Sequence, residues 1–111
     1  MKSSGYISMT NHNYNYYKEK YGLGVFEIEN GFIYIDDRAV IFKNKINDWH
    51  RLDGPAFISL LDDQHYSNWY INDCGVTTIL ETWAKENDID IDNLTDVDKA
   101  LIKLTWADYG K

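Results

Sequence analysis

The stretch VFEIENGFIYIDDRAVIFKNK, residues 25–45, alternates apolar and polar residues and is rich in β-branched and aromatic types. Such alternation is typical of antiparallel strands. Asn30-Gly31 lies between two of the alternating runs, and Asn-Gly favours a two-residue type I′ turn because both turn positions need a positive φ. We therefore predict a hairpin in which Glu29 pairs with Phe32 and Ile28 pairs with Ile33.

This pairing sorts the hairpin side chains onto two faces. The first face is wholly apolar and consists of Phe26, Ile28, Ile33 and Ile35. The second face consists of Glu27, Glu29, Phe32 and Tyr34. We expect the first face to pack in the core and the second to meet solvent. Asp36-Asp37-Arg38 then turns the chain into a third strand over 39–43, through a loop of either two or three residues.

The stretch WHRLDGPAFI, residues 49–58, predicts a turn that leads into a further strand. Asp53 can accept hydrogen bonds from backbone N–H groups, Gly54 precedes a proline and is held extended, and Pro55 lacks an N–H. A histidine and an arginine at such a turn usually bond backbone carbonyls, so we interpret this group as structural rather than catalytic. The residues assigned to turns are thus Asn30, Gly31, His50, Arg51, Asp53, Gly54 and Pro55.

The strand that follows this turn is AFISLL, and HYSNWYIN (65–72) is expected to be its partner. In AFISLL, the residues Ala56, Ile58 and Leu60 share one face. A turn at Asp62-Asp63-Gln64 connects the two strands.

The last third of the chain has helical periodicity. Thr78 stands three residues before Glu81, a capping-box spacing, and the apolar stripe that follows is Ile79, Leu80 and Trp83. A second helix is predicted to begin at Thr95, with Asp98 three residues later. Its apolar stripe, at i, i+3, i+4 and i+7, is Val97, Ala100, Leu101 and Leu104.

The predicted fold class is α+β: an antiparallel β-meander of about five strands followed by two C-terminal helices. We expect a single domain over 1–111, with a polar Tyr- and Asn-rich arm (1–21), a β-hairpin meander (22–76) and a helical hairpin (77–111). Within the arm, Tyr14, Tyr16 and Tyr17 can form either a short strand or part of a loose segment.

The composition limits the possible partners. The 111 residues include 18 Asp and Glu against 11 Lys and Arg, for a net charge of −7 and a pI of about 4.7. Without a basic stripe, direct binding to nucleic acid or to an anionic membrane surface is disfavoured, whereas a basic protein partner is compatible. The lone Cys74, and the lack of an apolar run of signal-peptide or membrane-spanning length, predict a soluble cytoplasmic protein.

No cofactor or metal is predicted. Asp88-x-Asp90-x-Asp92 is similar to the opening of a calcium loop, but Asn93 and Lys99 stand where the glycine and glutamate are needed. We interpret Cys74 as a bystander thiol rather than a nucleophile.

The motif His50-Arg51-x-Asp53-Gly54-Pro55-Ala56, followed by Trp69-Tyr70-x-Asn72, resembles the HR-x-DGPA β-hairpin repeats of short bacteriophage and other viral proteins. The resemblance covers residues 41–75, about a third of the chain. It implies short stacked hairpins, no enzymatic activity, and a phage or viral origin, in which case the cytoplasm would be that of the host cell. Two departures stand out: Asn72-Asp73-Cys74-Gly75 replaces the expected Asn-Gly, and no second His-Arg follows.

The leading functional hypothesis is a non-enzymatic phage-type protein that binds and inhibits or redirects a host protein with a basic surface, such as a defence component. Tyr and Trp are common at interface hot spots. The expected contacts are Phe32, Tyr34, Trp49, Trp69 and Tyr70, together with the acidic Glu86, Asp88, Asp90, Asp92 and Asp96. The acidic run from 81 to 98 can also be only a solvated face.

Two alternatives stay open. A nucleotide-binding sponge would stack a base on aromatic rings and meet the phosphates with Arg38, Arg51 and nearby lysines. A structural oligomer or virion component is the other.

Overall fold

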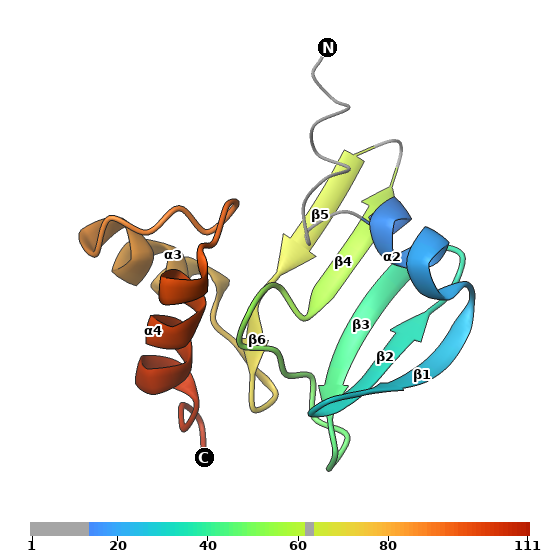
Figure 1. Cartoon of the computed structure of the whole chain (residues 1–111), viewed down its shortest axis with the longest axis horizontal. Coiled ribbons are helices and arrows are strands. Elements are labelled where there is room, and N and C mark those ends of the chain that lie inside the picture. Colours follow the sequence, from blue (N-terminus) through green and yellow to red (C-terminus); the bar gives the residue numbers. More distant parts are fainter. Residues whose placement is uncertain (1–13, 62–63) are drawn as a thin grey trace.

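The computed structural model describes residues 14–61 and 64–111 (Figure 1). The arm predicted for the first residues and the turn at Asp62-Asp63 lie outside this description. The first six elements are α2 (Tyr14–Tyr21), β1 (Gly24–Ile28), β2 (Gly31–Ile35), β3 (Ala39–Asn44), β4 (Phe57–Leu61) and β5 (Gln64–Asn68). The remaining elements are β6 (Tyr70–Ile71), β7 (Cys74–Gly75), α3 (Thr77–Glu86) and α4 (Asp96–Trp106).

The first five strands form one antiparallel sheet in the order β1-β2-β3-β4-β5, so each strand pairs with its neighbour in the sequence. Strands β6 and β7 form a separate two-stranded hairpin, which precedes α3 and α4. Figure 1 shows the sheet with α2 on one side of the molecule and the two C-terminal helices on the other. The predicted α+β meander with two C-terminal helices is confirmed.

Helix α2 covers one face of the sheet, and residues 14–21 are therefore neither a strand nor a loose arm. Tyr14 and Tyr17 lie one turn apart, and their side chains are buried against the apolar strand residues. Burial is compatible with these rings because each hydroxyl has a partner: Tyr14 Oη donates to the Asp36 carbonyl at 2.6 Å, and Tyr17 Oη accepts from Arg51. The core on this face consists of Tyr14, Tyr17, Ile33, Ile35, Val40, Phe42, Ala56 and Ile58.

The first hairpin exists, but its register differs from the predicted one by two residues. Ile28 pairs with Gly31 and Phe26 pairs with Ile33, so the loop is Glu29-Asn30. Neither Asn30 nor Gly31 has a positive φ, and the type I′ prediction was wrong. A shift of two residues leaves each side chain on its face, so the predicted apolar face still packs on the core.

Gly31 is required by the neighbouring strand rather than by its own φ. It pairs with Asn44 of β3, and a Cβ atom at this position would overlap the Lys43 carbonyl oxygen. The glycine therefore allows β2 and β3 to approach closely at the start of β2.

The connection between β2 and β3 is the shorter of the two predicted loops. Ile35 pairs with Val40, and the Asp36 N–H donates to the Ala39 carbonyl, which leaves Asp37-Arg38 as the turn. The Asp36 carboxylate accepts from the Arg38 and Ala39 N–H groups, both at 2.8 Å. This aspartate fixes the turn by the side-chain-to-backbone bonding that favours Asp at such positions.

The β6–β7 hairpin and the two C-terminal helices enclose a second core made of Trp69, Ile71, Val76, Leu80, Ile102 and Trp106. Trp69 is only 1% exposed, so its expected role as a contact residue is wrong. Ile71 pairs with Cys74, and Asn72 and Asp73 both have positive φ, as a type I′ turn requires. The type I′ turn thus occurs at Asn72-Asp73, where the viral repeats have Asn-Gly.

Helix α4 begins as predicted but faces the other way. Thr95 Oγ1 accepts from the Asp98 N–H and the Asp98 carboxylate accepts from the Thr95 N–H, which confirms the capping box. The predicted apolar stripe, however, points outward, and Ile102 and Trp106 are buried in its place. A Trp ring buries more apolar surface than Val or Leu, and this orients the helix toward the second core.

Helix α3 begins at Thr77, and its N-cap residue Val76 makes no side-chain cap bond, so the box predicted from Thr78 and Glu81 was wrong. Leu80 is buried as predicted, Trp83 is half-buried, and Ile79 is 44% exposed. The Thr77 hydroxyl instead accepts from the Trp69 N–H at 2.9 Å, which ties the helix start to the β6–β7 hairpin.

We predict that Gly31→Ala lowers the free energy of unfolding by about 2 kcal/mol or more, because the new methyl group meets backbone that cannot move without breaking the β2–β3 ladder. Urea denaturation measures this change. Gly75→Ala is the matched control, since its Cβ would make only an ordinary 3.6 Å contact with the Tyr70 ring. Equal stability of the two variants would contradict the close approach.

Candidate functional site

The sheet face opposite α2 carries a row of apolar and aromatic side chains across four strands. The register places Val25 beside Tyr34, Tyr34 beside Ile41, and Ile41 beside Phe57. Phe32 lies in the next row, beside Lys43. These are the positions that alternate with the buried core residues, so their side chains point away from α2. Phe32, Tyr34, Ile41 and Phe57 are each half-buried, and Val25 is 56% exposed.

Trp49 extends this row beyond the strands. Its ring stacks on Phe57 with the centroids 5.7 Å apart and an angle of 6° between the planes. Tyr70 then meets Trp49 edge to face at 5.1 Å. We call Phe32, Tyr34, Trp49, Phe57 and Tyr70 the aromatic face. Four of these five rings were expected contacts from the sequence.

Two hydrogen bonds with Asp73 of the β6–β7 turn hold the Trp49 backbone in place. The Asp73 N–H donates to the Trp49 carbonyl at 2.9 Å, and the Trp49 N–H donates to the Asp73 carboxylate at 3.2 Å. Trp49 also forms a bridge with Lys43 of β3. The Trp49 backbone is therefore held by β3 on one side and by the β6–β7 turn on the other.

A cation covers part of the aromatic face. The Lys43 ammonium lies 4.6 Å from the centroid of the Tyr34 ring, a cation–π distance. Because Lys43 is adjacent to Phe32 across the strands, it stands at the polar edge of this apolar surface.

Arg51 lies on the α2 side of the sheet, and its side chain is 10% exposed. Its Nε donates to the Asp53 carboxylate at 2.9 Å, its Nη1 to the Pro55 carbonyl at 3.1 Å, and its Nη2 to the Tyr17 hydroxyl at 2.8 Å. The guanidinium carbon also lies 4.0 Å from the centroid of the Phe42 ring. Arg51 thus bonds within the turn, as expected, and also links the turn to α2 through Tyr17.

The Arg51 guanidinium leaves no room for a side chain at position 54, which is Gly54. A Cβ atom at Gly54 would lie 2.6 Å from Arg51 Cζ and 2.8 Å from Nη1. Its φ is not in the positive region, so the need for glycine comes from the close approach alone. Pro55 and Ala56 follow it as buried residues, and the Ala56 N–H and carbonyl bond Asn68 and Phe42 on the two neighbouring strands.

The ionisation of the Asp53 carboxyl follows from this environment. Burial would raise its pKa, but the Arg51 charge, the hydrogen bond from Arg51 and the more distant charges of Lys99 and Lys103 together hold the pKa below its usual value. Asp53 therefore stays ionised near neutral pH and compensates the buried guanidinium.

His50 joins β3 to the β6–β7 hairpin. Its N–H donates to the Phe42 carbonyl at 3.0 Å, and its Nδ1 accepts from the Asn72 N–H at 2.9 Å. Burial lowers the pKa of His50, and the Lys111 charge lowers it further against an opposing effect of Asp48. The imidazole is therefore neutral, and its Nδ1 acceptor is already used by backbone.

The acidic residues expected to meet a partner lie at the end of α3, in the connection to α4 and at the first residue of α4. Glu86, Asp88, Asp90, Asp92 and Asp96 are all exposed. The Asp90 carboxylate accepts from the Asp92 N–H at 3.0 Å and so takes part in the turn. Across residues 14–61 and 64–111, no group of three or more His, Cys, Asp or Glu is placed to hold a metal ion.

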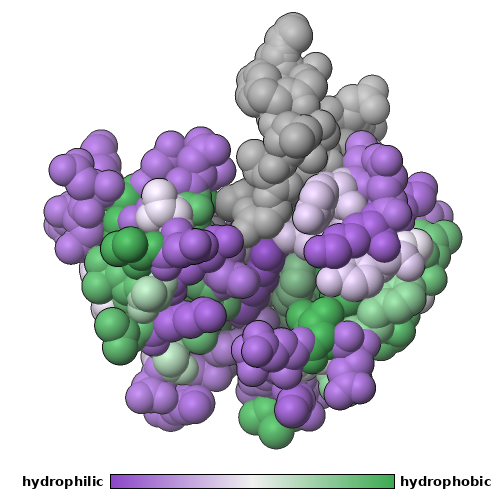
Figure 2. Space-filling view, in the orientation of Figure 1, coloured by the Kyte–Doolittle hydropathy of each residue, from purple (hydrophilic) through white to green (hydrophobic). Residues whose placement is uncertain are grey.

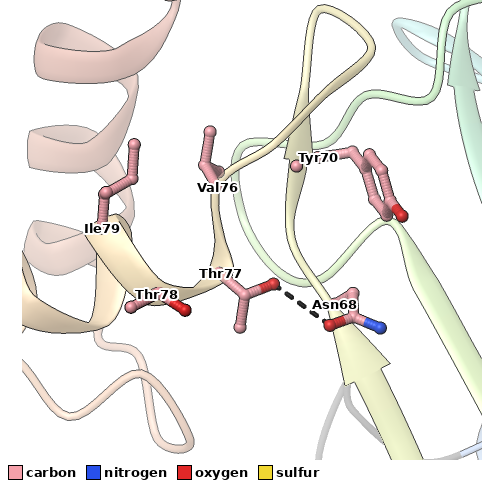
Figure 3. A pocket seen from close by; sticks show the side chains of 7 residues that line it. Asn68, Tyr70, Val76, Thr77, Thr78 and Ile79 are labelled. Carbon is pink, nitrogen blue, oxygen red and sulfur yellow. Dashed lines mark hydrogen bonds between the residues drawn. The ribbon is translucent and has the colours of Figure 1, made fainter.

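A pocket of about 250 Å³ opens where β5 leads into the β6–β7 hairpin and α3 (Figure 3). It is lined by the uncharged residues Asn68, Tyr70, Gly75, Val76, Thr77, Thr78 and Ile79. The Thr77 hydroxyl points at the Asn68 side-chain oxygen, 3.3 Å away. The side chains of Thr77 and Asn68 in the pocket lining are thus bonded to one another.

Sequence reasoning missed Phe57 and Ile41 as members of the exposed sheet face. Both could have been found from the alternation, because Phe57 stands between Ala56 and Ile58, and Ile41 stands between Val40 and Phe42. If the flanking residues face the core, the residue between them faces outward.

In comparisons with protein-family models, curated proteins and solved structures, nothing matches this chain. Among the helices of the described residues, none has both the length and the apolar character needed to cross a bilayer.

We predict that Arg51→Lys lowers the free energy of unfolding by about 2 to 3 kcal/mol, because lysine cannot reproduce the three-way fork and leaves partners unsatisfied. Urea denaturation checks this value. Arg38→Lys, at an exposed position, is the control and should change stability by about 0.5 kcal/mol or less. A loss at Arg51 as small as that of the control would show that the fork does not matter.

We also predict a pH dependence that comes from His50. Since its pKa is lower in the folded state, its contribution to stability is complete above the ordinary value of about 6.5 and is lost as the pH falls from there through the folded pKa. His50→Asn keeps an acceptor that does not titrate in this range. The urea midpoint of this variant should therefore change less than wild type between about pH 7 and pH 5; identical profiles would refute the assignment.

Proposed function

We propose that this protein acts by binding, as a non-enzymatic protein of phage type that binds a host protein and inhibits or redirects it. The observation that carries the proposal is the aromatic face. Trp49 is in ring contact with both Phe57 and Tyr70, and Phe32, Tyr34 and Phe57 point to the side of the sheet that α2 does not cover, where Ile41 lies between Tyr34 and Phe57. Fixed rings bring contact area at a small loss of side-chain entropy, which is why Tyr and Trp are common at hot spots.

The aromatic face is organised before binding. The stacked pair of Trp49 and Phe57, and the cation over Tyr34, hold the rings in defined positions. Val25 and Tyr66, 56% and 47% exposed, belong to the same side of the sheet and add apolar area at its two ends. A surface of this kind loses little entropy when a partner docks.

The acidic residues support a partner with a basic surface. The chain carries a net charge of −7, and the five acidic residues of the α3–α4 region are exposed. A negative surface of this type accelerates encounter with a positive one and disfavours direct contact with nucleic acid or an anionic membrane. The resemblance of residues 41–75 to viral hairpin repeats supports a phage origin, which makes the host-cell cytoplasm the proposed location and a host protein the proposed target.

The nucleotide-sponge alternative loses one of its two arginines in the structure, whereas Arg38 stays exposed. Arg51 was one of the two arginines expected to meet phosphates, but its guanidinium is buried and donates to Tyr17, Asp53 and Pro55. The aromatic face retains Lys43, which lies over a ring. This arrangement favours a protein partner over an anionic ligand.

We predict that the wild-type protein retains a stoichiometric partner from host lysate, and that Phe32→Ala with Tyr34→Ala weakens the measured affinity at least about tenfold, the scale of hot-spot rings. Retention on immobilised protein, then calorimetry with the purified partner, gives both results. Tyr16→Ala is the control, because this exposed tyrosine belongs to α2 on the opposite side of the sheet. Recovery of no stoichiometric partner, or equal affinity of the double variant, would overturn the proposal.

A further inference from the structure

Helix α4 has two apolar faces, and only one of them packs against other described residues of the protein. Ile102 and Trp106 pack in the second core. Val97, Leu101 and Leu104 follow a spacing of i, i+4 and i+7, so they form one stripe along the opposite side of the helix. They are 77%, 37% and 84% exposed. Figure 2 shows hydrophobic residues at the surface over the C-terminal helices.

This stripe differs from ordinary scattered apolar residues at a surface. A single exposed leucine needs no explanation, but three large apolar side chains in helical register make a continuous ridge. It is the same ridge that the sequence periodicity singles out as the packing face of this helix. A ridge with this spacing is the form in which one helix packs against another.

The charges beside the ridge indicate which surface fits it. Asp96 and Lys103 are seven residues apart, two turns, and therefore lie on the same flank of the ridge near its opposite ends. Both residues are exposed. When a second α4 lies antiparallel against the first, Asp96 of each copy comes next to Lys103 of the other. The antiparallel arrangement also aligns the two helix dipoles favourably.

A partner with a uniformly basic surface fits this ridge less well. Lys103 would be repelled by the positive charge of such a partner, whereas the acidic run over 86–92 would be attracted to it. The ridge is thus complementary to itself, apolar along the middle and of opposite charge toward its two ends.

We propose that two copies of this chain associate through α4, antiparallel and about a two-fold axis, with Val97 of each copy facing Leu104 of the other. Such a contact is isologous, because the same patch serves on both copies. One helix face makes a small interface, so the dimer forms at micromolar rather than nanomolar concentrations. The dimer does not depend on the host-protein function, since the ridge shares no residue with the aromatic face.

Sedimentation equilibrium of the whole chain, from about 5 µM to about 500 µM at physiological salt, tests this proposal. A monomer–dimer equilibrium is expected, and Val97→Gln with Leu104→Gln should raise its dissociation constant at least about tenfold, as loss of apolar anchors does. Ile46→Gln is the matched control, because Ile46 is also 77% exposed but lies in the loop after β3. A monomer at every concentration, or a dimer unchanged by the double variant, overturns the proposal.

Charge reversal distinguishes a second copy from any other occupant. Asp96→Lys should weaken the dimer, because it places two lysines together at each end of the interface. Asp96→Lys combined with Lys103→Asp restores opposite charges only in a self-complementary antiparallel pair, so its dissociation constant should return to within about threefold of wild type. Far-ultraviolet circular dichroism verifies that each variant is folded. A double variant as weak as Asp96→Lys alone refutes the antiparallel pairing.

Discussion

The buried guanidinium of Arg51 is the interaction on which the arrangement of the sheet side of the molecule depends. Its planar fork donates in three directions at once: to α2 through Tyr17, to the turn through Asp53, and to the start of the next strand through Pro55. A charge this deeply buried is tolerated only when its donors are satisfied and a counter-charge is near. The positions of these elements, and the absence of a side chain at Gly54, follow from that requirement.

The segment that contains Arg51 also connects the two cores. Trp49 and His50 bond β3 on one side and the Asn72-Asp73 turn on the other, and the Arg51 N–H donates to the Tyr70 carbonyl. The Asn72 side chain in turn donates to the Ala107 and Tyr109 carbonyls beyond α4. These hydrogen bonds therefore hold the Trp49 part of the aromatic face in place. The motif His-Arg-x-Asp-Gly-Pro-Ala supports the proposed function indirectly, because it positions Trp49 against Phe57.

The two proposed interaction surfaces use different elements. The aromatic face belongs to the sheet and the segment before β4, whereas the ridge belongs to α4. A protein that pairs through α4 presents two aromatic faces, and an oligomeric partner would bind these with a higher effective concentration. Because the surfaces share no residue, self-association and partner binding can be removed separately.

The amino-acid sequence by itself determined the features that depend on neighbours in the chain. The alternating runs specify strands and faces, and Thr95 with Asp98 specifies the start of α4. Only the tertiary structure decided two other features. One is the register of the first hairpin, in which Gly31 lies directly against the β3 backbone. The other is the orientation of α4, in which Trp106 packs in the second core in place of the predicted apolar stripe. The tertiary structure also placed Trp69 inside and folded residues 14–21 into a helix. Each of these outcomes rests on contacts between residues distant in sequence, whose energies exceed the local preferences that a pattern records.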